Sequence, residues 1–133
     1  MATRPSRRPK RILVVDDDPD VRRLLVLMLG AAGYEVDTAE DAYAALFSLY
    51  DTNPDLLLLD LVLPERDGWD VIRIVRATPE TRALPIVVMS AKFRLINTRE
   101  HGVQGYIAKP LVPLALLDTL DAVLRGDSSS TDR

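Results

Sequence analysis

The chain has 133 residues, a formal net charge of −3 and no cysteine, and its length suits a single domain with a hydrophobic core. The absence of cysteine excludes a disulfide framework and a cysteine-ligated metal site. No apolar run approaches the roughly 20 residues that cross a bilayer, and no apolar signal-peptide core follows the basic N-terminus. We therefore expect a cytoplasmic protein without a membrane contact.

Charge is spread unevenly along the chain. Residues 1–11 carry five bases and no acid, so the net charge of −3 leaves −8 for the rest. An acidic body argues against broad nucleic-acid binding by the fold, and we expect no direct DNA binding. We expect a flexible basic arm over 1–10, a folded domain over 11–125 and a disordered polar tail over 126–133. The arm is either a solvated extension or a small contact with nucleic acid or an acidic partner.

Five short segments have the pattern of β-strands. The clearest is a run of four leucines, 56–59, which ends on Asp60. A short apolar run between turn signals is typical of a strand that is buried on both faces, as in a parallel sheet. In chain order, the predicted strands are 12–15, 34–38, 56–60, 86–89 and 105–108.

Helical periodicity fills the segments between these strands. Asp18 followed by Pro19, and Asp41 further on, are typical N-terminal helix signals, and Gly33 is a typical helix stop. The predicted helices are 19–32, 42–50, 68–76, 95–101 and 113–124. In the last helix, spacing predicts that Leu114, Leu117 and Leu120 face the core.

Five strands alternating with five helices predict an α/β fold. Right-handed crossovers then give a five-stranded parallel sheet that is doubly wound, with helices on both faces. The polar residues follow the same plan, because each predicted strand except the second ends on one or more of them. They are Asp16 and Asp17, Asp60, Ser90 and Lys109. Parallel strands bring their carboxyl ends to one edge, so these side chains are expected to share one crevice.

This set of side chains has a definite chemistry. Three carboxylates with one hydroxyl and one ammonium suit Mg²⁺, which prefers oxygen ligands and keeps several waters. A carboxylate beside Mg²⁺ and a lysine is placed to attack an electrophilic phosphorus, while the two cations offset charge on the transferring phosphoryl group.

Four stretches resemble the signature segments of the response-regulator receiver domain. They are 12–19, 54–69, 84–91 and 105–110, and the resemblance extends over about 11–125. It implies a flavodoxin-like receiver fold with strand order 2-1-3-4-5. It further implies a phospho-accepting protein of two-component signal transduction that is not an enzyme in the usual sense.

The resemblance also assigns roles to individual residues. Asp60 would be the phosphoacceptor, assisted by Lys109 and Ser90. Asp17, Asp60 and the backbone carbonyl of Val62 would ligate Mg²⁺ directly, and Asp16 would hold it through water. Ser90 and Tyr106 would form a switch pair. The peptide bond between Lys109 and Pro110 would be cis.

The same resemblance implies partners. The phosphoryl donor would be a sensor histidine kinase or a histidine phosphotransfer protein, and a downstream protein would read the switched face, with a phosphorylation-dependent dimer left open. If the chain is complete, it is a stand-alone receiver. The 19 residues from Ser90 to Lys109 are about one helical turn shorter than the family usually has.

Two other functions remain open at this stage. The segment from Asp16 to Asp18 also resembles the start of a haloacid-dehalogenase-type phosphatase, in which Asp16 would be the nucleophile. Against this, Asp20 stands where that family has Thr or Val, and the chain is too short for a cap domain. The other alternative is a degenerate receiver that only binds proteins, without phosphorylation.

Overall fold

A computed structural model describes residues 8–64, 67–91 and 102–126 of the chain. Its centre is one five-stranded sheet with the order β2-β1-β3-β4-β5, in which every neighbouring pair is parallel. The strands are β1 (Arg11–Val15), β2 (Glu35–Ala39), β3 (Leu56–Asp60), β4 (Ile86–Ser90) and β5 (Gly105–Ala108). The predicted sheet and its strand order are confirmed.

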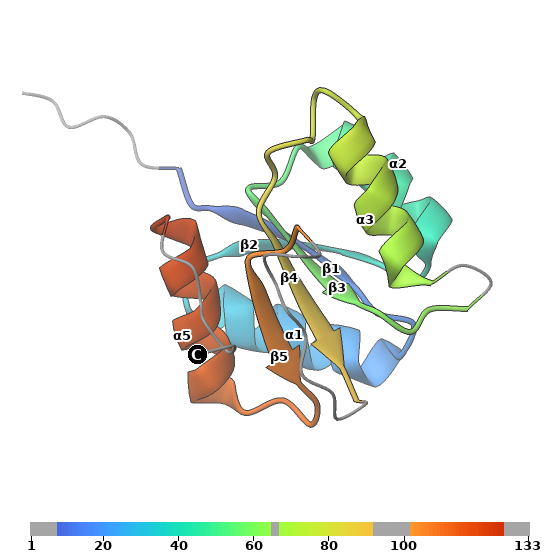
Figure 1. Ribbon diagram of the computed structural model, residues 1–133. Helices are drawn as coiled ribbons and strands as arrows, with labels where there is room; N and C mark the ends of the chain where they lie inside the picture. Colours follow the sequence, from blue (N-terminus) through green and yellow to red (C-terminus); the bar gives the residue numbers. More distant parts are fainter. Residues whose placement is uncertain (1–7, 65–66, 92–101, 127–133) are drawn as a thin grey trace, which may run out of the picture.

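Helices cover both faces of this sheet (Figure 1). The described residues contain α1 (Pro19–Ala31), α2 (Ala42–Thr52), α3 (Gly68–Ala77) and α5 (Pro113–Leu124). Helices α2 and α3 pack on one face, and α1 and α5 pack on the other. The predicted helix over 95–101 lies outside the described residues, so four of the five predicted helices are observed there. None of these four has the length and hydropathy of a transmembrane span.

The leucine run forms the middle of the molecule. Leu57 and Leu59 join the core under α2 and α3, whereas Leu56 and Leu58 join the core under α1 and α5. Successive strand residues point to opposite faces, so a central strand between two helical layers needs an apolar residue at every position. All four leucines are fully buried, as the unbroken run predicts.

Side-chain caps fix the start of three helices. Asp18 accepts a hydrogen bond from the backbone N–H of Asp20, and Asp41 accepts one from Ala44. These two caps confirm the predicted helix starts. Asp67 caps α3 in the same way, through the N–H of Asp70, at a position where the sequence pattern predicts only a turn.

The inner face of α5 differs from the prediction. Leu116, Leu120 and Val123 form its buried stripe, and Leu114 is 75% exposed. Successive helical residues turn by about 100°, so Leu114 lies about 200° around the helix from Leu116 and faces solvent. The prediction that Leu114 belongs to the core is wrong, because two helical stripes of leucine overlap in this segment.

One half-buried arginine ties α3 to two loops that precede strands. The guanidinium of Arg76 donates to the carbonyls of Gly102, Arg82 and Leu84 and to the side chain of Gln104, at 2.7–3.2 Å. Five hydrogen bonds use the five N–H donors of this group. Burial lowers its pKa, but the bonds compensate for lost hydration. Arg76 therefore holds the N-terminal edge of β4 and β5 against α3.

Candidate functional site

The polar residues that end the strands lie together at the carboxyl edge of the sheet. Asp16 is 0% exposed, and Asp60 and Ser90 are each 5% exposed. These three are the buried polar or charged residues of the described part of the chain. Burial of such groups is costly unless they are paired, so their gathering at one edge marks a site rather than a stretch of core.

Lys109 joins the two buried carboxylates. Its Nζ lies 2.6 Å from Asp16 Oδ2 and 3.0 Å from Asp60 Oδ2. The lysine side chain is itself 17% exposed, so the three groups form a largely desolvated ion cluster. Two short contacts between opposite charges compensate for the hydration that these groups lose on burial. The predicted convergence of Asp16, Asp60 and Lys109 is therefore observed directly.

The other oxygens of these carboxylates accept backbone hydrogen bonds. Asp16 Oδ1 accepts from the N–H of Asp18 at 2.9 Å, and Asp60 Oδ1 accepts from the N–H of Val62 at 3.0 Å. Arg22 also donates to the backbone carbonyl of Asp16 at 2.7 Å. Each carboxylate is thus oriented at both oxygens before any ligand arrives. The contribution of Arg22 has no signal in the sequence, because it depends on how α1 packs.

Burial and pairing shift the protonation equilibria of the cluster. Desolvation raises the pKa of Asp60, and the hydrogen bonds from Val62 and Lys109 only partly oppose it. Burial acts to lower the pKa of Lys109, but its hydrogen bonds to Asp16 and Asp60 outweigh that effect and raise the pKa. Lys109 therefore remains charged at neutral pH, and the Asp60 carboxylate is more basic than an exposed one.

A glycine allows the loop after β3 to pass close to α3. The N–H of Gly68 donates to the carbonyl of Leu61 at 2.9 Å. A Cβ at position 68 would lie 2.7 Å from the carbonyl oxygen of Asp60 and 2.8 Å from the Cα of Leu61. Any larger residue would collide with the backbone that carries Asp60. The sequence showed this glycine only as a turn residue.

The carboxylates also satisfy the requirements of a metal site. One oxygen from each of Asp16, Asp17 and Asp60 lies within 4.8 Å of the others. Asp17 is exposed and, with Asp60, Val62 and Lys109, lines a hollow of about 440 Å³ that is open to solvent. Three carboxylates beside an open hollow fit Mg²⁺, which takes a few protein oxygens and retains water.

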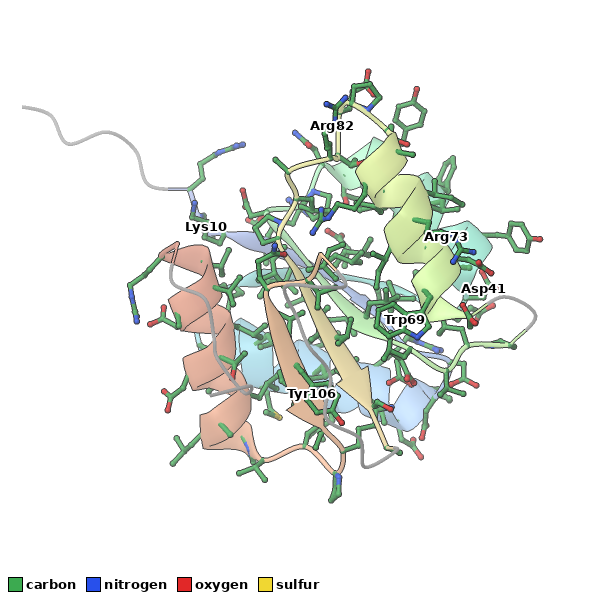
Figure 2. The ribbon with its side chains drawn as sticks, in the orientation of Figure 1. Lys10, Asp41, Trp69, Arg73, Arg82 and Tyr106 are labelled. Carbon is green, nitrogen blue, oxygen red and sulfur yellow. The ribbon has the colours of Figure 1, made fainter. Side chains whose placement is uncertain are left out.

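The two residues of the predicted switch pair lie on neighbouring strands. Ser90 is the last residue of β4 and pairs with Ala108 on β5. Tyr106 on β5 pairs with Val88 on β4. Tyr106 is half-buried and packs against the core under α2 and α3. Figure 2 shows its position on β5, and shows Trp69 at the first turn of α3. The bond between Lys109 and Pro110 is cis, as the resemblance implied.

Comparison with known proteins gives a consistent set of similarities. Residues 12–121 match the model of the response regulator receiver domain. The chain is 38% identical over 119 residues to the DNA-binding response regulator MtrA of Mycolicibacterium smegmatis, covering 87% of this chain and 51% of MtrA. It is also 38% identical over 124 residues to the transcriptional regulatory protein ResD of Bacillus subtilis, covering 91% of this chain and 50% of ResD.

Solved structures agree with these sequence matches. The chemotaxis protein CheY4 of Vibrio cholerae superposes with a TM-score of 0.80 at 29% identity, covering 86% of this chain and 98% of CheY4. A CheY-like receiver domain protein of Methanospirillum hungatei gives a TM-score of 0.81 at 27% identity, covering 89% of this chain and 95% of that protein.

One sequence-based prediction is corrected by these relatives. The chain spans about half the length of the curated relatives it matches, and MtrA is named as a DNA-binding regulator. The prediction of no direct DNA binding is therefore wrong for this group of proteins. It treated the acidic charge of one domain as a property of the whole regulator, whereas DNA contact in such relatives need not involve the receiver surface.

Proposed function

The chain belongs to the response-regulator receiver domain family, and we propose that Asp60 is the residue that accepts its phosphoryl group. Receiver domains act in two-component signalling and are not classical enzymes. The observation that carries the assignment is the position of Asp60. It is a buried carboxylate at the end of the central strand, and Lys109 holds it beside two further carboxylates.

The proposed reaction is a transfer from a phosphohistidine donor. A carboxylate oxygen of Asp60 forms the new bond to phosphorus, the bond from phosphorus to the imidazole nitrogen breaks, and the leaving imidazole takes a proton from solvent. The carboxylate of Asp60 supplies the electron pair for this attack. The ammonium of Lys109 is already within hydrogen-bond distance of Asp60, so it can contact the phosphoryl oxygens.

Metal binding is part of the proposal. Asp17, Asp60 and the backbone carbonyl of Val62 would hold Mg²⁺ directly, and Asp16 would hold it through water. When bound, the ion would neutralise charge on the carboxylates and on the transferring phosphoryl group. The exposed position of Asp17 keeps this side of the hollow open to solvent, which favours weak binding of a largely hydrated ion.

We further propose that Ser90 and Tyr106 switch the output face. The hydroxyl of Ser90 would hydrogen-bond the phosphoryl group, and Tyr106 would turn inward. Moving a population from about 1% to 99% active requires roughly 5.5 kcal/mol of differential binding. One hydrogen bond to a charged group contributes only about 1.5–3 kcal/mol. Ser90 therefore needs the help of the Lys109 contact or of a bound partner.

The phosphatase alternative does not suit the geometry of Asp16. That residue is fully buried and does not line the open hollow, whereas Asp60 does. We also propose that the folded domain extends over 11–125, because these limits include the family match over 12–121 and the whole of α5. The cytoplasmic location stays a prediction.

Phosphorylation by acetyl phosphate tests the proposal. The wild-type chain should incorporate phosphate in the presence of Mg²⁺. Asp60→Asn should incorporate none, and Asp17→Asn should require much higher Mg²⁺. Asp118→Asn is the matched control, because Asp118 is an exposed carboxylate on α5. Full incorporation by Asp60→Asn would overturn the assignment.

A further inference from the structure

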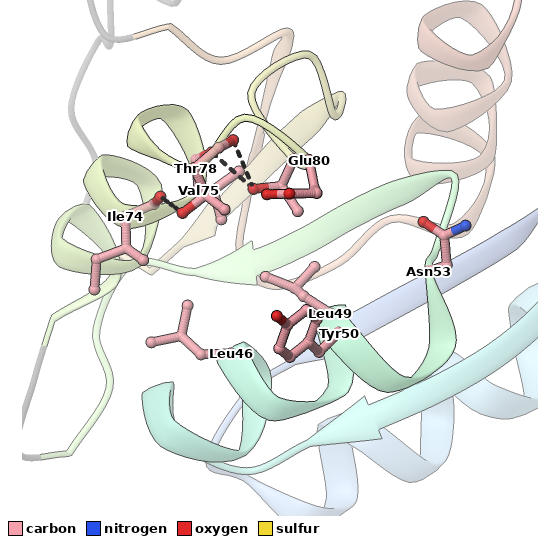
Figure 3. A pocket seen from close by; sticks show the side chains of 9 residues that line it. Leu46, Leu49, Tyr50, Asn53, Ile74, Val75, Thr78 and Glu80 are labelled. Atoms are coloured by element: carbon pink, nitrogen blue, oxygen red, sulfur yellow. Dashed lines mark hydrogen bonds between the residues drawn. The ribbon is translucent and has the colours of Figure 1, made fainter.

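A groove lies between α2 and α3 (Figure 3). Its volume is about 430 Å³, a size typical of ligand and side-chain pockets. Apolar side chains from both helices line most of it: Leu46 and Leu49 on α2, and Ile74 and Val75 on α3. Its polar lining residues are Asn53, Thr78, Thr81 and Glu80, of which Glu80 carries a charge. The groove can therefore take an apolar side chain but presents a carboxylate beside it.

An aromatic stripe continues this groove along the outer side of α2. Tyr43, Phe47 and Tyr50 are 58%, 70% and 87% exposed, and their spacing of four and three residues places them on one helical face. Tyr50 belongs to both the stripe and the groove lining. Exposed aromatic residues gathered next to an apolar hollow are typical of an interaction surface.

The electrostatic character of this surface is negative. Helices α2 and α3 both end here, at Thr52 and Ala77, and the C-terminal end of a helix carries partial negative charge. Helix α2 contains no Lys or Arg. The base in the last turn of α3 is the half-buried Arg76, which is hydrogen-bonded to the loops before β4 and β5. Glu80 and the exposed Asp51 add carboxylates. Two further bases adjoin the lining in sequence: Arg73, which is paired with Asp70, and the exposed Arg82.

We propose that the groove and its aromatic stripe bind an amphipathic segment of a partner protein that carries Lys or Arg beside its apolar residues. Apolar side chains of the segment would fill the space between Leu46 and Ile74. Its cations would lie beside Glu80 and over the ring of Tyr50, where cation–π attraction adds to charge complementarity. An acidic or purely apolar segment would lack the cation contacts with Glu80 and with the ring of Tyr50.

The area of the stripe favours such a segment over a second copy of this chain. Aromatic side chains present about 150–250 Å² each, so the three exposed fractions amount to about 400 Å². A stable interface of standard size buries about 800 Å² on each partner. The stripe by itself is therefore half the size that a symmetric dimer needs, and together with the groove it suits one helix or extended strand.

The position of the groove makes its binding independent of phosphorylation. Helices in this fold run antiparallel to the strands, so the C-terminal ends of α2 and α3 lie at the amino edge of the sheet. The carboxylate cluster lies at the opposite, carboxyl edge. Loading Asp60 with a phosphoryl mimic should leave the groove unchanged, which separates this proposal from the assignment of Asp60.

Two synthetic amphipathic peptides with the same leucine pattern test the inference, one carrying Lys and the other Glu at every polar position. Each is titrated into the ¹⁵N-labelled full chain while amide shifts are followed. The Lys peptide should shift the amides of α2 and of residues 74–81, with an affinity at least about tenfold above that of the Glu peptide. Beryllofluoride should change that affinity by less than about twofold.

Two matched variants complete the test. Phe47→Ala should lower the affinity for the Lys peptide by about tenfold. Leu27→Ala, at an equally exposed residue of α1, should leave that affinity unchanged. Equal affinity for the two peptides, shifts centred on α1 or α5, or undiminished binding to Phe47→Ala would each overturn the proposal. Shifts of α2 amides on dilution of the protein alone would identify a second copy as the occupant and would also overturn it.

Discussion

Gly68→Ala should distort the loop that carries Asp60, while Gly30→Ala should not harm the fold. The added Cβ at position 68 would lie 2.7 Å from the carbonyl oxygen of Asp60 and 2.8 Å from the Cα of Leu61. Both contacts are to backbone, which cannot rotate aside. Ordinary contact begins at 3.4 Å, so α3 or the loop must move by about 0.7 Å, the difference between 3.4 and 2.7 Å.

Overpacking of this kind lowers the free energy of unfolding by about 1–3 kcal/mol. The higher helix propensity of alanine offsets less than about 1 kcal/mol of this loss. We therefore expect a net loss of about 1–2 kcal/mol in the free energy of unfolding, which lowers the Tm by about 4–8 °C in a chain of this length. At Gly30 a Cβ meets nothing within 4 Å. Gly30→Ala should therefore raise stability by about 0.5–1 kcal/mol.

Urea unfolding and the rate of phosphorylation by acetyl phosphate measure the two consequences of Gly68→Ala. A moved loop displaces Val62, whose N–H orients Asp60, so the rate should fall together with the stability. Gly30→Ala is the control for both assays. Equal stability of Gly68→Ala and Gly30→Ala, with an unchanged phosphorylation rate in both, would refute the close-approach argument.

Three further predictions concern the metal, the buried carboxylate of Asp60 and the half-buried guanidinium of Arg76. Excess EDTA should abolish phosphorylation by acetyl phosphate, because three clustered carboxylates leave the site strongly negative. In metal-free buffer, Asp60→Asn should be more stable than wild type at pH 7 but not near pH 3. The raised pKa of Asp60 means that the folded state binds more protons, so wild-type stability falls as pH rises through that pKa. Arg76→Met should cost about 2–4 kcal/mol in urea unfolding, since four acceptors lose their donors.

Each of these has an outcome that would count against it. Phosphorylation at the normal rate in EDTA would remove the metal from the mechanism. A stability difference between Asp60→Asn and wild type that does not vary with pH would show that desolvation of the carboxylate is not its cause. Arg76→Met as stable as Arg73→Met, a substitution at an exposed arginine of the same helix, would show that the loops do not depend on the guanidinium of Arg76.

The sequence was sufficient for the sheet because the relevant signals are local and strong. The leucine run 56–59 could only be buried on both faces, and the caps at Asp18 and Asp41 act within three residues of themselves. The site followed from the same pattern. Parallel strands bring Asp16, Asp60 and Lys109 to one edge of the sheet irrespective of loop conformation. The proximity of these side chains was therefore predictable from the sequence without any distance.

What the sequence could not supply depends on packing between distant segments. Leu114 and Leu116 are equally apolar, and only the docking of α5 determines which one is buried. Arg76 contacts residues up to 28 positions away, which no local pattern indicates. The close approach at Gly68 likewise appears only when α3 is placed against the end of β3.

The most direct test of the account is to identify the residue that carries the phosphoryl group. The protein is treated with acetyl phosphate and Mg²⁺, the acyl phosphate is trapped by borohydride reduction, and the modified peptide is sequenced by mass spectrometry. The account predicts modification of Asp60 in the wild-type chain and none in Asp60→Asn. Modification of Asp16, or the absence of any trapped adduct in the wild-type chain, would contradict it.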